Sequence, residues 1–318
     1  MIDLRYLLHG VAIALGWFGA VNVAIAAAAV IAARRAARRE RPGSAAFWLG
    51  LRLLPAAAST VFVGVLFVPS YWTYEPRSVE DLDVTLALLA LATLSCICAA
   101  AVRGCAAWRR ARQRTRAWLR LARPLDVDSA IPVYEIPIHT PMMALVGVMR
   151  PRLIVTRGVV SALTIDELRA GVAHEIGHLR AWDNLKRLAM VAAPDVLAAT
   201  RIAATIQARW ASAAEHAADR AAGCDSESRC ALASALVKVA KLTPTATPIA
   251  EPISTLVGGG DIASRVQRLL DDDAPAPPTL SARRPWMSLA IAAAFAIAYG
   301  PLLRLVHEAT EVIVNTLP

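Results

Sequence analysis

The chain has 318 residues, of which 57% are hydrophobic and 19% are charged. Soluble domains are usually about 45–50% apolar and about 25% charged, so this composition argues against an ordinary cytosolic protein. The net charge of +9 does not indicate nucleic-acid binding, because the arginines flank apolar segments and no aromatic platform or reading motif accompanies them. The five cysteines lack the spacing of a disulfide scaffold.

Four apolar segments are long enough to cross a bilayer, which takes about 20 helical residues. They cover roughly 6–33, 45–71, 84–108 and 286–306. The first contains no charged residue, and its arginines follow it rather than precede it, so we interpret it as an anchor and not as a cleaved signal peptide. Arg52 lies near one end of the second segment, where its side chain is expected to reach the membrane surface.

Arginine clusters flank these segments on one side of the membrane. Five arginines follow the first segment, five follow the third, and two precede the fourth. The loop between the second and third segments is instead mostly acidic. Because basic loops stay in the cytoplasm, we predict an external amino terminus and a cytoplasmic stretch from about 109 to 285. The expected location is the inner (plasma) membrane of a bacterium, which the chain crosses several times.

The resulting organisation has four parts. Residues 1–116 hold three transmembrane helices with short loops, and 117–270 form a cytoplasmic domain. Residues 271–285 are an acidic, proline-rich linker, and 286–318 hold the fourth helix and a short external tail.

The cytoplasmic domain mixes short strands with helices. Stretches rich in Val and Ile at 131–137 and 152–156 predict strands. Thr164–Glu167 has the form of a capping box, which opens a helix to about residue 181. An apolar stretch at 185–208, broken near Pro194-Asp195, predicts a helix that packs on the core or lies in the membrane interface. Further helices are predicted at 211–222 and 228–242, followed by a loop at 243–260.

The segment His174-Glu175-Ile176-Gly177-His178 falls within the helix that the capping box opens. Residues four apart share a helix face, so both imidazoles can reach one metal ion. Glu175 is placed beside the same point and is the candidate base that takes a proton from metal-bound water. The alternative is a pair of core histidines that hydrogen-bond to their neighbours.

A later acidic pair completes the pattern. A catalytic zinc uses three protein ligands and one open position. Glu215 and Asp219 are four apart and share a face, so Glu215 is the candidate third ligand and Asp219 the acceptor for the free ring N–H of a ligand histidine. Alone the pair is a weak signal, since Ser212 and Glu215 also fit a capping box. His216 points away from Glu215 and is expected at the surface or behind the ligands. Two imidazoles favour zinc over calcium or magnesium.

Three stretches carry a resemblance to a known group: Arg150–Thr156, Leu168–His178 and Asp183–Leu185. They resemble the integral-membrane gluzincin zinc metallopeptidases, most closely the BlaR/MecR-type family, with HtpX-like and CAAX prenyl-protein proteases as relatives. The resemblance implies a mainly α integral membrane protein with four transmembrane helices. A cytoplasmic α+β zincin-like metallopeptidase domain, with an HExxH helix and a small sheet, would lie between the third and fourth helices. The carboxyl-terminal sensor domain of BlaR is expected to be absent.

The resemblance also implies roles for individual residues. His174, His178 and Glu215 would hold one zinc ion per chain. Glu175 would polarise the bound water and later protonate the leaving amine, while Asp219 would orient a ligand histidine, most simply His174. These roles agree with the chemistry that the residue types and spacings suggest by themselves.

Two further features of the group have candidates in this sequence. Its substrates lie extended along an edge strand near the metal, paired by backbone hydrogen bonds. The strand at 152–156 is the candidate, with an ordinary core strand as the alternative. Arg265 and Arg268 resemble a late arginine-bearing helix of these peptidases, but a role as surface charge is favoured for both.

The function that follows is a membrane-bound, zinc-dependent endopeptidase that hydrolyses peptide bonds on the cytoplasmic side, in regulated proteolysis or signal transduction. Its partners would be the lipid bilayer and a protein or peptide substrate, but no nucleic acid. The substrate would be a transcriptional repressor, a damaged membrane protein or the chain itself, cut within 243–260. The alternative is a non-catalytic or single-turnover signal transducer that uses the peptidase fold as a relay. Glu175 argues against it, because a scaffold has no need of a base beside two ligands.

Overall fold

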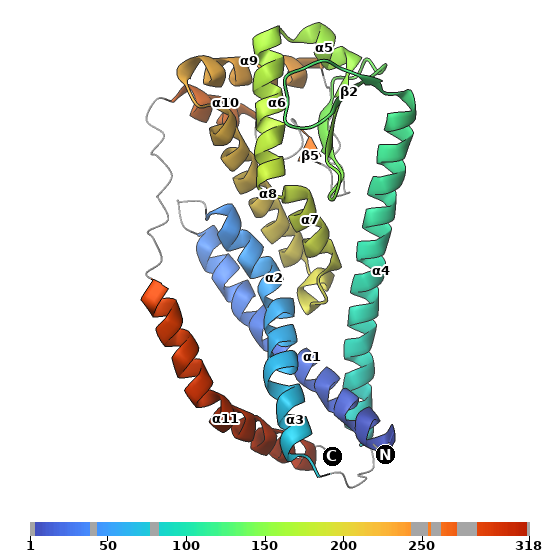
Figure 1. The fold of residues 1–318 in the computed structure, drawn as a ribbon, viewed down its shortest axis with the longest axis vertical. Helices are drawn as coiled ribbons and strands as arrows, with labels where there is room; N and C mark the ends of the chain where they lie inside the picture. Colours follow the sequence, from blue (N-terminus) through green and yellow to red (C-terminus); the bar gives the residue numbers. More distant parts are fainter. Residues whose placement is uncertain are drawn as a thin grey trace.

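The computed structural model describes residues 4–38, 43–76, 83–242, 254–255, 262–271 and 285–316. Within them the chain is mainly helical, with one small sheet at the end of the molecule opposite the two termini (Figure 1). Of the predicted loop at 243–260, only residues 254–255 are described. Of the predicted linker at 271–285, only the two end residues are described.

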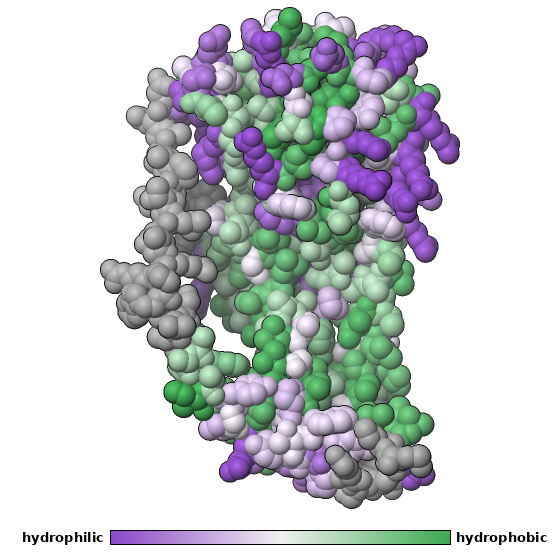
Figure 2. Space-filling view, in the orientation of Figure 1, coloured by the Kyte–Doolittle hydropathy of each residue, from purple (hydrophilic) through white to green (hydrophobic). Residues whose placement is uncertain are grey.

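Three long apolar helical segments form the lower part of the molecule. They are α1 (Leu4–Ala37), the run of α2 (Ala45–Val61), a π-helical turn (Phe62–Phe67) and α3 (Val68–Tyr74), and α4 (Val84–Leu121). All three are long and apolar enough to cross a membrane, as predicted for the first three segments. Figure 2 shows hydrophobic residues over this part of the molecule and hydrophilic ones gathered above and below it.

The fourth predicted segment lies within α11 (Pro285–Thr316), which packs on α3. Among the described residues, only the first three segments meet the length and composition needed for a span. A membrane crossing by α11 therefore stays a prediction.

In the described part of the chain, the sheet contains five short strands in the order β1-β2-β4-β3-β5. β2 and β4 are parallel, whereas the other neighbouring pairs are antiparallel. The strand bounds are β1 Arg123–Pro124, β2 Val133–Ile136, β3 Met143–Val146, β4 Arg152–Thr156 and β5 Ser254–Thr255. β4 matches the predicted strand residue for residue, but it lies in the interior of the sheet. The prediction that 152–156 is an edge strand open to a substrate is therefore wrong.

Side chains of β4 alternate between two apolar cores, as the pleat of a strand requires. Leu153 and Val155 belong to a core shared with helices α6 (Ile165–Arg180) and α9 (Ser226–Leu242). Ile154 faces the opposite way, where Trp118 and Leu119 from the end of α4 cover the sheet. The sheet is thus enclosed on both faces. The remaining helices of this domain are α5 (Arg157–Ala162), α7 (Asp183–Ala192), α8 (Arg201–Ala222) and α10 (Ile262–Leu270).

The apolar stretch after α6 forms a helical hairpin rather than one broken helix. α7 and α8 are joined by a link with a 3-10 turn (Val196–Ala199), which confirms the break near Pro194-Asp195. The separate helix predicted at 211–222 is wrong, because α8 runs unbroken from Arg201 to Ala222. The hairpin packs on α1 and α2 in a common apolar core, so the membrane helices and the domain are in direct contact.

Candidate metal centre

Helix α6 places three candidate residues around one point. The Thr164 hydroxyl accepts a hydrogen bond from Glu167 N (3.3 Å), and the Glu167 carboxylate accepts one from Thr164 N (2.8 Å), so the predicted capping box is present. His174 and His178 follow one turn apart, with ring centroids separated by 4.8 Å. Both histidines and Glu175 are completely buried.

Helix α8 supplies the facing carboxylates. Glu215 and Asp219 lie one turn apart and are both buried. α8 can approach closely because the residue before His178 is Gly177. A Cβ atom at this position would lie 3.1 Å from Ala218 Cα and 3.3 Å from Ala218 Cβ, tighter than ordinary contact. The glycine within the histidine motif therefore sets the separation of the two helices.

The three predicted ligands converge. His174 Nε2 lies 3.5 Å from Glu215 Oε2, and His178 Nε2 lies 3.5 Å from Glu215 Oε1. One ligand atom from each residue lies within 4.8 Å of the others, so the group could hold a metal ion.

The other nitrogen of each imidazole faces a carboxylate. His174 Nδ1 lies 3.0 Å from Asp219 Oδ1, and His178 Nδ1 lies 2.7 Å from Asp183 Oδ2. An N–H on each Nδ1 would donate to these oxygens and leave both Nε2 lone pairs directed toward the common point. Carboxylates behind ligand histidines fix the tautomer and the ring orientation in metal sites. Asp219 was anticipated in this role from its place on the helix.

The sequence interpretation assigned no role to Asp183. It is the first residue of α7, directly after Trp182, whose φ of 58° turns the chain sharply between α6 and α7. This corner brings Asp183 back onto His178, five residues earlier. An acidic residue just past the end of a histidine-bearing helix is the signal that could have indicated it.

Arg265, on α10, lies inside the site and not on the surface. Its side chain is only 1% exposed. Its guanidinium donates from Nε and Nη2 to the two oxygens of Asp219, at 2.8 and 2.6 Å, and its Nη1 lies 3.0 Å from Glu215 Oε2. The preference for surface charge was therefore wrong for this residue, because two buried carboxylates on α8 compensate the cation. Arg268 is exposed, as expected, and contacts the half-buried His216.

Burial and neighbouring charges shift the proton affinities of the site. Loss of water raises the pKa of Glu175, although the two histidines act in the opposite direction. Burial disfavours the charged form of His178, but hydrogen bonding to Asp183 and the charge of Glu215 outweigh it and raise the pKa of this imidazole to about 10. Without a bound cation, the site therefore holds protons where a metal would place positive charge.

The donor atoms fit a metal ion. Within the described part of the chain, no hydrogen-bond partner of normal geometry is found for the Nε2 atoms of His174 and His178 or for either carboxylate oxygen of Glu215. Buried polar atoms are nearly always paired, so this group of unpaired donors and acceptors indicates a missing ligand. Two imidazoles and one carboxylate leave an open fourth position, the arrangement of a catalytic rather than a closed structural site.

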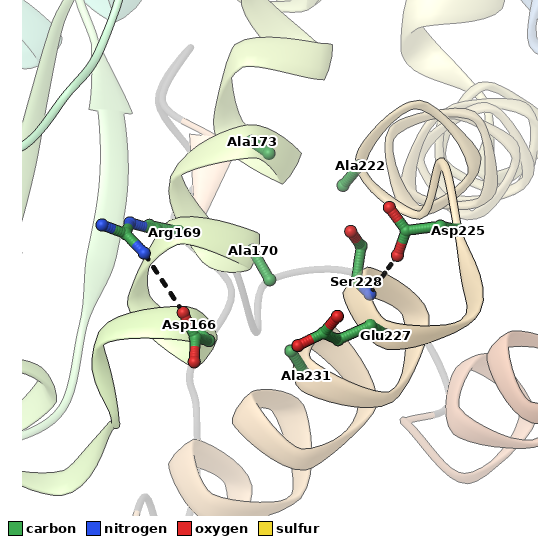
Figure 3. A pocket seen from close by; sticks show the side chains of 9 residues that line it. All are labelled: Asp166, Arg169, Ala170, Ala173, Ala222, Asp225, Glu227, Ser228 and Ala231. Atoms are coloured by element: carbon green, nitrogen blue, oxygen red, sulfur yellow. Dashed lines mark hydrogen bonds and ion pairs between the residues drawn. The ribbon is translucent and has the colours of Figure 1, made fainter.

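A hollow of about 260 Å³ lies on another face of α6. Figure 3 shows Ala170 and Ala173 of α6 facing α8 and α9 across it, with an ion pair between Asp166 and Arg169 at one side. None of the candidate metal ligands lines this hollow. It is therefore separate from the centre formed by the histidines.

Comparison with known families agrees with this geometry. The model of peptidase family M48 matches residues 108–257, which run from the last turns of α4 past β5 and include α6 and α8. This region is similar to that family of zinc metallopeptidases, which includes HtpX-like and BlaR-like proteins. The three apolar helices make it a membrane-anchored form. No curated protein matches the chain.

Proposed function

We propose that the protein is a membrane-embedded zinc endopeptidase that hydrolyses peptide bonds at the cytoplasmic face of the membrane. The observation that carries this proposal is the convergence of His174 Nε2, His178 Nε2 and Glu215 at one buried point, with Glu175 beside it. Two imidazoles and a carboxylate favour zinc among the common divalent ions.

When bound, zinc would polarise the scissile carbonyl and lower the pKa of water. The chain supplies the remaining functions. His174, His178 and Glu215 would hold the ion, and Asp219 and Asp183 would fix the two imidazole rings. The buried Glu175 carboxylate lies among His174, His178 and the backbone of Leu145, where it is placed to accept a proton from the attacking water.

The raised pKa of Glu175 suits a group that first accepts a proton and then donates it to the leaving amine. A carboxyl group with an ordinary pKa is almost fully ionised near neutral pH, so it would lose the accepted proton to water rather than keep it for the leaving amine. Burial of Glu175 thus supports one residue in both roles.

The cytoplasmic placement is supported by the arginines and the helix directions. The carboxyl-terminal turn of α1 carries Arg34 and Arg35, and both α1 and α4 run toward the metal-bearing domain (Figure 1). Positive residues at these helix ends favour the cytoplasmic side. The membrane that we propose is the inner membrane of a bacterium.

The most suitable strand for a substrate is β3, because β4 is internal. β3 contacts α6, and among the described residues it is followed in the sheet only by the two-residue β5. Ser254 and Thr255 of β5 pair antiparallel with Leu145 and Ala144, so a piece of the chain lies along the position proposed for a substrate. This supports the chain itself as one substrate, beside a transcriptional repressor or a damaged membrane protein.

The proposal is tested with Glu175→Gln in the full-length protein in detergent, loaded with one equivalent of zinc. Mass spectrometry would follow cleavage of an unfolded protein and of the chain. We expect the variant to keep its zinc and to lose about 10²–10⁴-fold in rate, the contribution of a general base. Glu227→Gln, at an exposed position on α9, is the matched control and should cut like the wild type.

A different result would favour the other candidate function. Zinc bound without any cleavage by the wild type, on either substrate, would point to the signal transducer that uses the peptidase fold as a relay. Absence of zinc binding would contradict both the metal centre and the peptidase.

A further inference from the structure

The link between α7 and α8 lies among the membrane helices. We call residues 193–200 the membrane tip. Asn22 of α1 makes two hydrogen bonds to it, since its Nδ2 donates to Pro194 O (3.1 Å) and its Oδ1 accepts from Val196 N (3.1 Å). Arg103 Nη2 of α4 donates to Ala193 O (3.3 Å). Pro194 and Val196 also form part of the wall of an apolar cavity of about 500 Å³ lined by α1 and α4.

A buried ion pair joins the membrane tip to the second membrane helix. Arg52 of α2 donates from Nη1 to Asp195 Oδ2 and from Nη2 to Met190 O (2.7 Å). The side chains of Arg52 and Asp195 are 1% and 0% exposed. The expectation that Arg52 reaches the membrane surface is therefore wrong, because its charge is compensated inside the protein. Ionisable residues within membrane segments are costly to bury and commonly mark functional positions.

Helix α7 connects this ion pair to the metal centre. Its last turn contains Met190, which Arg52 binds, and its first residue is Asp183, which binds His178. The next residue, Asn184, donates from Nδ2 to Leu145 O (3.0 Å) and Gly147 O (3.2 Å), at and just beyond the end of β3. One ten-residue helix, about 15 Å long, therefore contacts α2 at one end and a candidate metal ligand and the candidate substrate strand at the other.

We propose that Arg52 is a positioning residue for the metal centre. Its ion pair with Asp195 fixes the far end of α7, and α7 in turn holds Asp183 against His178. A displacement of α2 within the membrane would move this carboxylate and so change how firmly His178 is oriented. The inference rests on the proposed function for its catalytic meaning, but the placement of α7 by Arg52 can be measured without metal.

The first test compares zinc affinities of full-length variants in detergent, by competition with a chromophoric chelator. Carboxylates behind ligand histidines typically contribute 10–100-fold to metal affinity, so partial misplacement of Asp183 should cost about 10-fold. We expect this loss in Arg52→Gln and in Asp195→Asn, together with a changed cobalt absorption spectrum. Arg52→Lys, which keeps the charge, should stay within about threefold of the wild type. Ser59→Ala is the matched control, because this buried hydroxyl on α2 donates only to Pro55 O of its own helix.

A double-mutant comparison with Asp183→Asn separates positioning from general stability. If Arg52 acts through Asp183, Arg52→Gln should add less than about twofold to the loss in affinity that Asp183→Asn already causes. Losses that multiply in full would overturn the proposal. So would equal losses in Arg52→Lys and Arg52→Gln, or unchanged affinity in Arg52→Gln.

Hydrogen exchange of the metal-free protein gives a readout that does not depend on the proposed function. Arg52→Gln should accelerate amide exchange in α7 and leave exchange in α9 unchanged, because α9 packs away from the membrane tip. Exchange that rises equally in both helices would show a general loss of stability and would count against positioning. If the wild type binds no zinc, the peptidase proposal fails, while this experiment still decides whether Arg52 places α7.

Discussion

Among the residues that the structure describes, two groups of histidine and glutamate occur at opposite ends of the molecule. His174, His178 and Glu215 form the first, on α6 and α8. The second consists of Glu75, at the end of α3, with His307 and Glu311 on α11. In both groups one ligand atom from each residue lies within 4.8 Å of the others. Figure 1 shows α6 and the junction of α3 with α11 at the two extremes of the long axis.

The groups differ in burial and in what fixes their side chains. The first is completely enclosed, and each of its imidazoles has Nδ1 on a carboxylate and Nε2 toward Glu215. In the second, the His307 side chain is 21% exposed, its Nδ1 lies 3.6 Å from Glu75, and its ring stacks on Tyr74. Closeness of three donors is therefore a weak criterion for a metal site. A stronger criterion is a pair of imidazole rings that are each held at Nδ1 by a carboxylate, with Nε2 directed toward the third donor.

The largest expected difference is in metal content. His178→Ala should abolish stoichiometric zinc binding, because it leaves one imidazole and one carboxylate at the centre. His307→Ala should keep one zinc per chain. Elemental analysis after gel filtration would measure both. A full equivalent in His178→Ala, or its loss in His307→Ala, would reverse the assignment of the two groups.

The next effect concerns the stability of the metal-free protein. Arg265→Met removes the cation between Asp219 and Glu215 and leaves two buried carboxylates less compensated. Breaking a buried ion pair in this way typically costs about 3–5 kcal/mol. Chemical unfolding of the metal-free protein should show the loss, whereas Arg268→Met, at an exposed position on the same helix, should change the free energy of unfolding by less than about 0.5 kcal/mol.

A smaller effect is expected from the carboxylate behind His174. Asp219→Asn keeps the shape of the side chain but removes its charge, and should weaken zinc binding about 10–100-fold. Glu311→Gln makes the same chemical change, an acid to an amide, at a donor of the second group and should leave the affinity unchanged. If the two variants bind zinc equally well, the supporting contacts of the first group do not contribute to its affinity.

The smallest expected effect is the pH dependence of zinc binding, which follows from the protons released when the metal binds. The pKa of His178 in the metal-free protein is about 10, above its ordinary value, so the ring is protonated at pH 7 and must lose that proton to bind zinc. Zinc affinity should therefore rise with pH up to about 10 and level off above it. Against the effect of burial, contacts with Asp219 and Glu215 raise the pKa of His174 as well, so calorimetry at pH 7 in buffers of different ionisation enthalpy should detect release of at least one proton on binding. Binding that is independent of pH between 7 and 9 would contradict the raised pKa.

The parts of the site that lie on one helix could be predicted from the sequence. Residues four apart share a helix face whatever surrounds the helix, so the spacing placed His174 beside His178 and Glu215 beside Asp219. The capping box of α6 is equally local, since Thr164 and Glu167 bond to each other. Such features depend only on backbone geometry within one or two turns.

The remaining contacts depend on elements that are distant in the chain. Arg265 is buried because α10 packs beside two carboxylates on α8, and Arg52 is buried because the membrane tip brings Asp195 to it. Neither partner can be recognised from the local sequence of the arginine. The interior position of β4 could have been predicted from the sequence. The unbroken apolar run at 153–155 is typical of a strand covered on both faces.

Helix α4 passes without interruption from the apolar helical part of the molecule into the domain that contains the candidate metal centre. Its 38 residues span about 57 Å, roughly 27 Å more than the hydrocarbon core of a bilayer. Its final turns pack directly on the sheet, so the length of the helix sets the distance between the bilayer and the sheet. The height of the sheet above the bilayer therefore depends on the number of residues in α4. Deleting four residues from the polar part of α4 would lower the sheet by about 6 Å and turn it by about 40° about the helix axis.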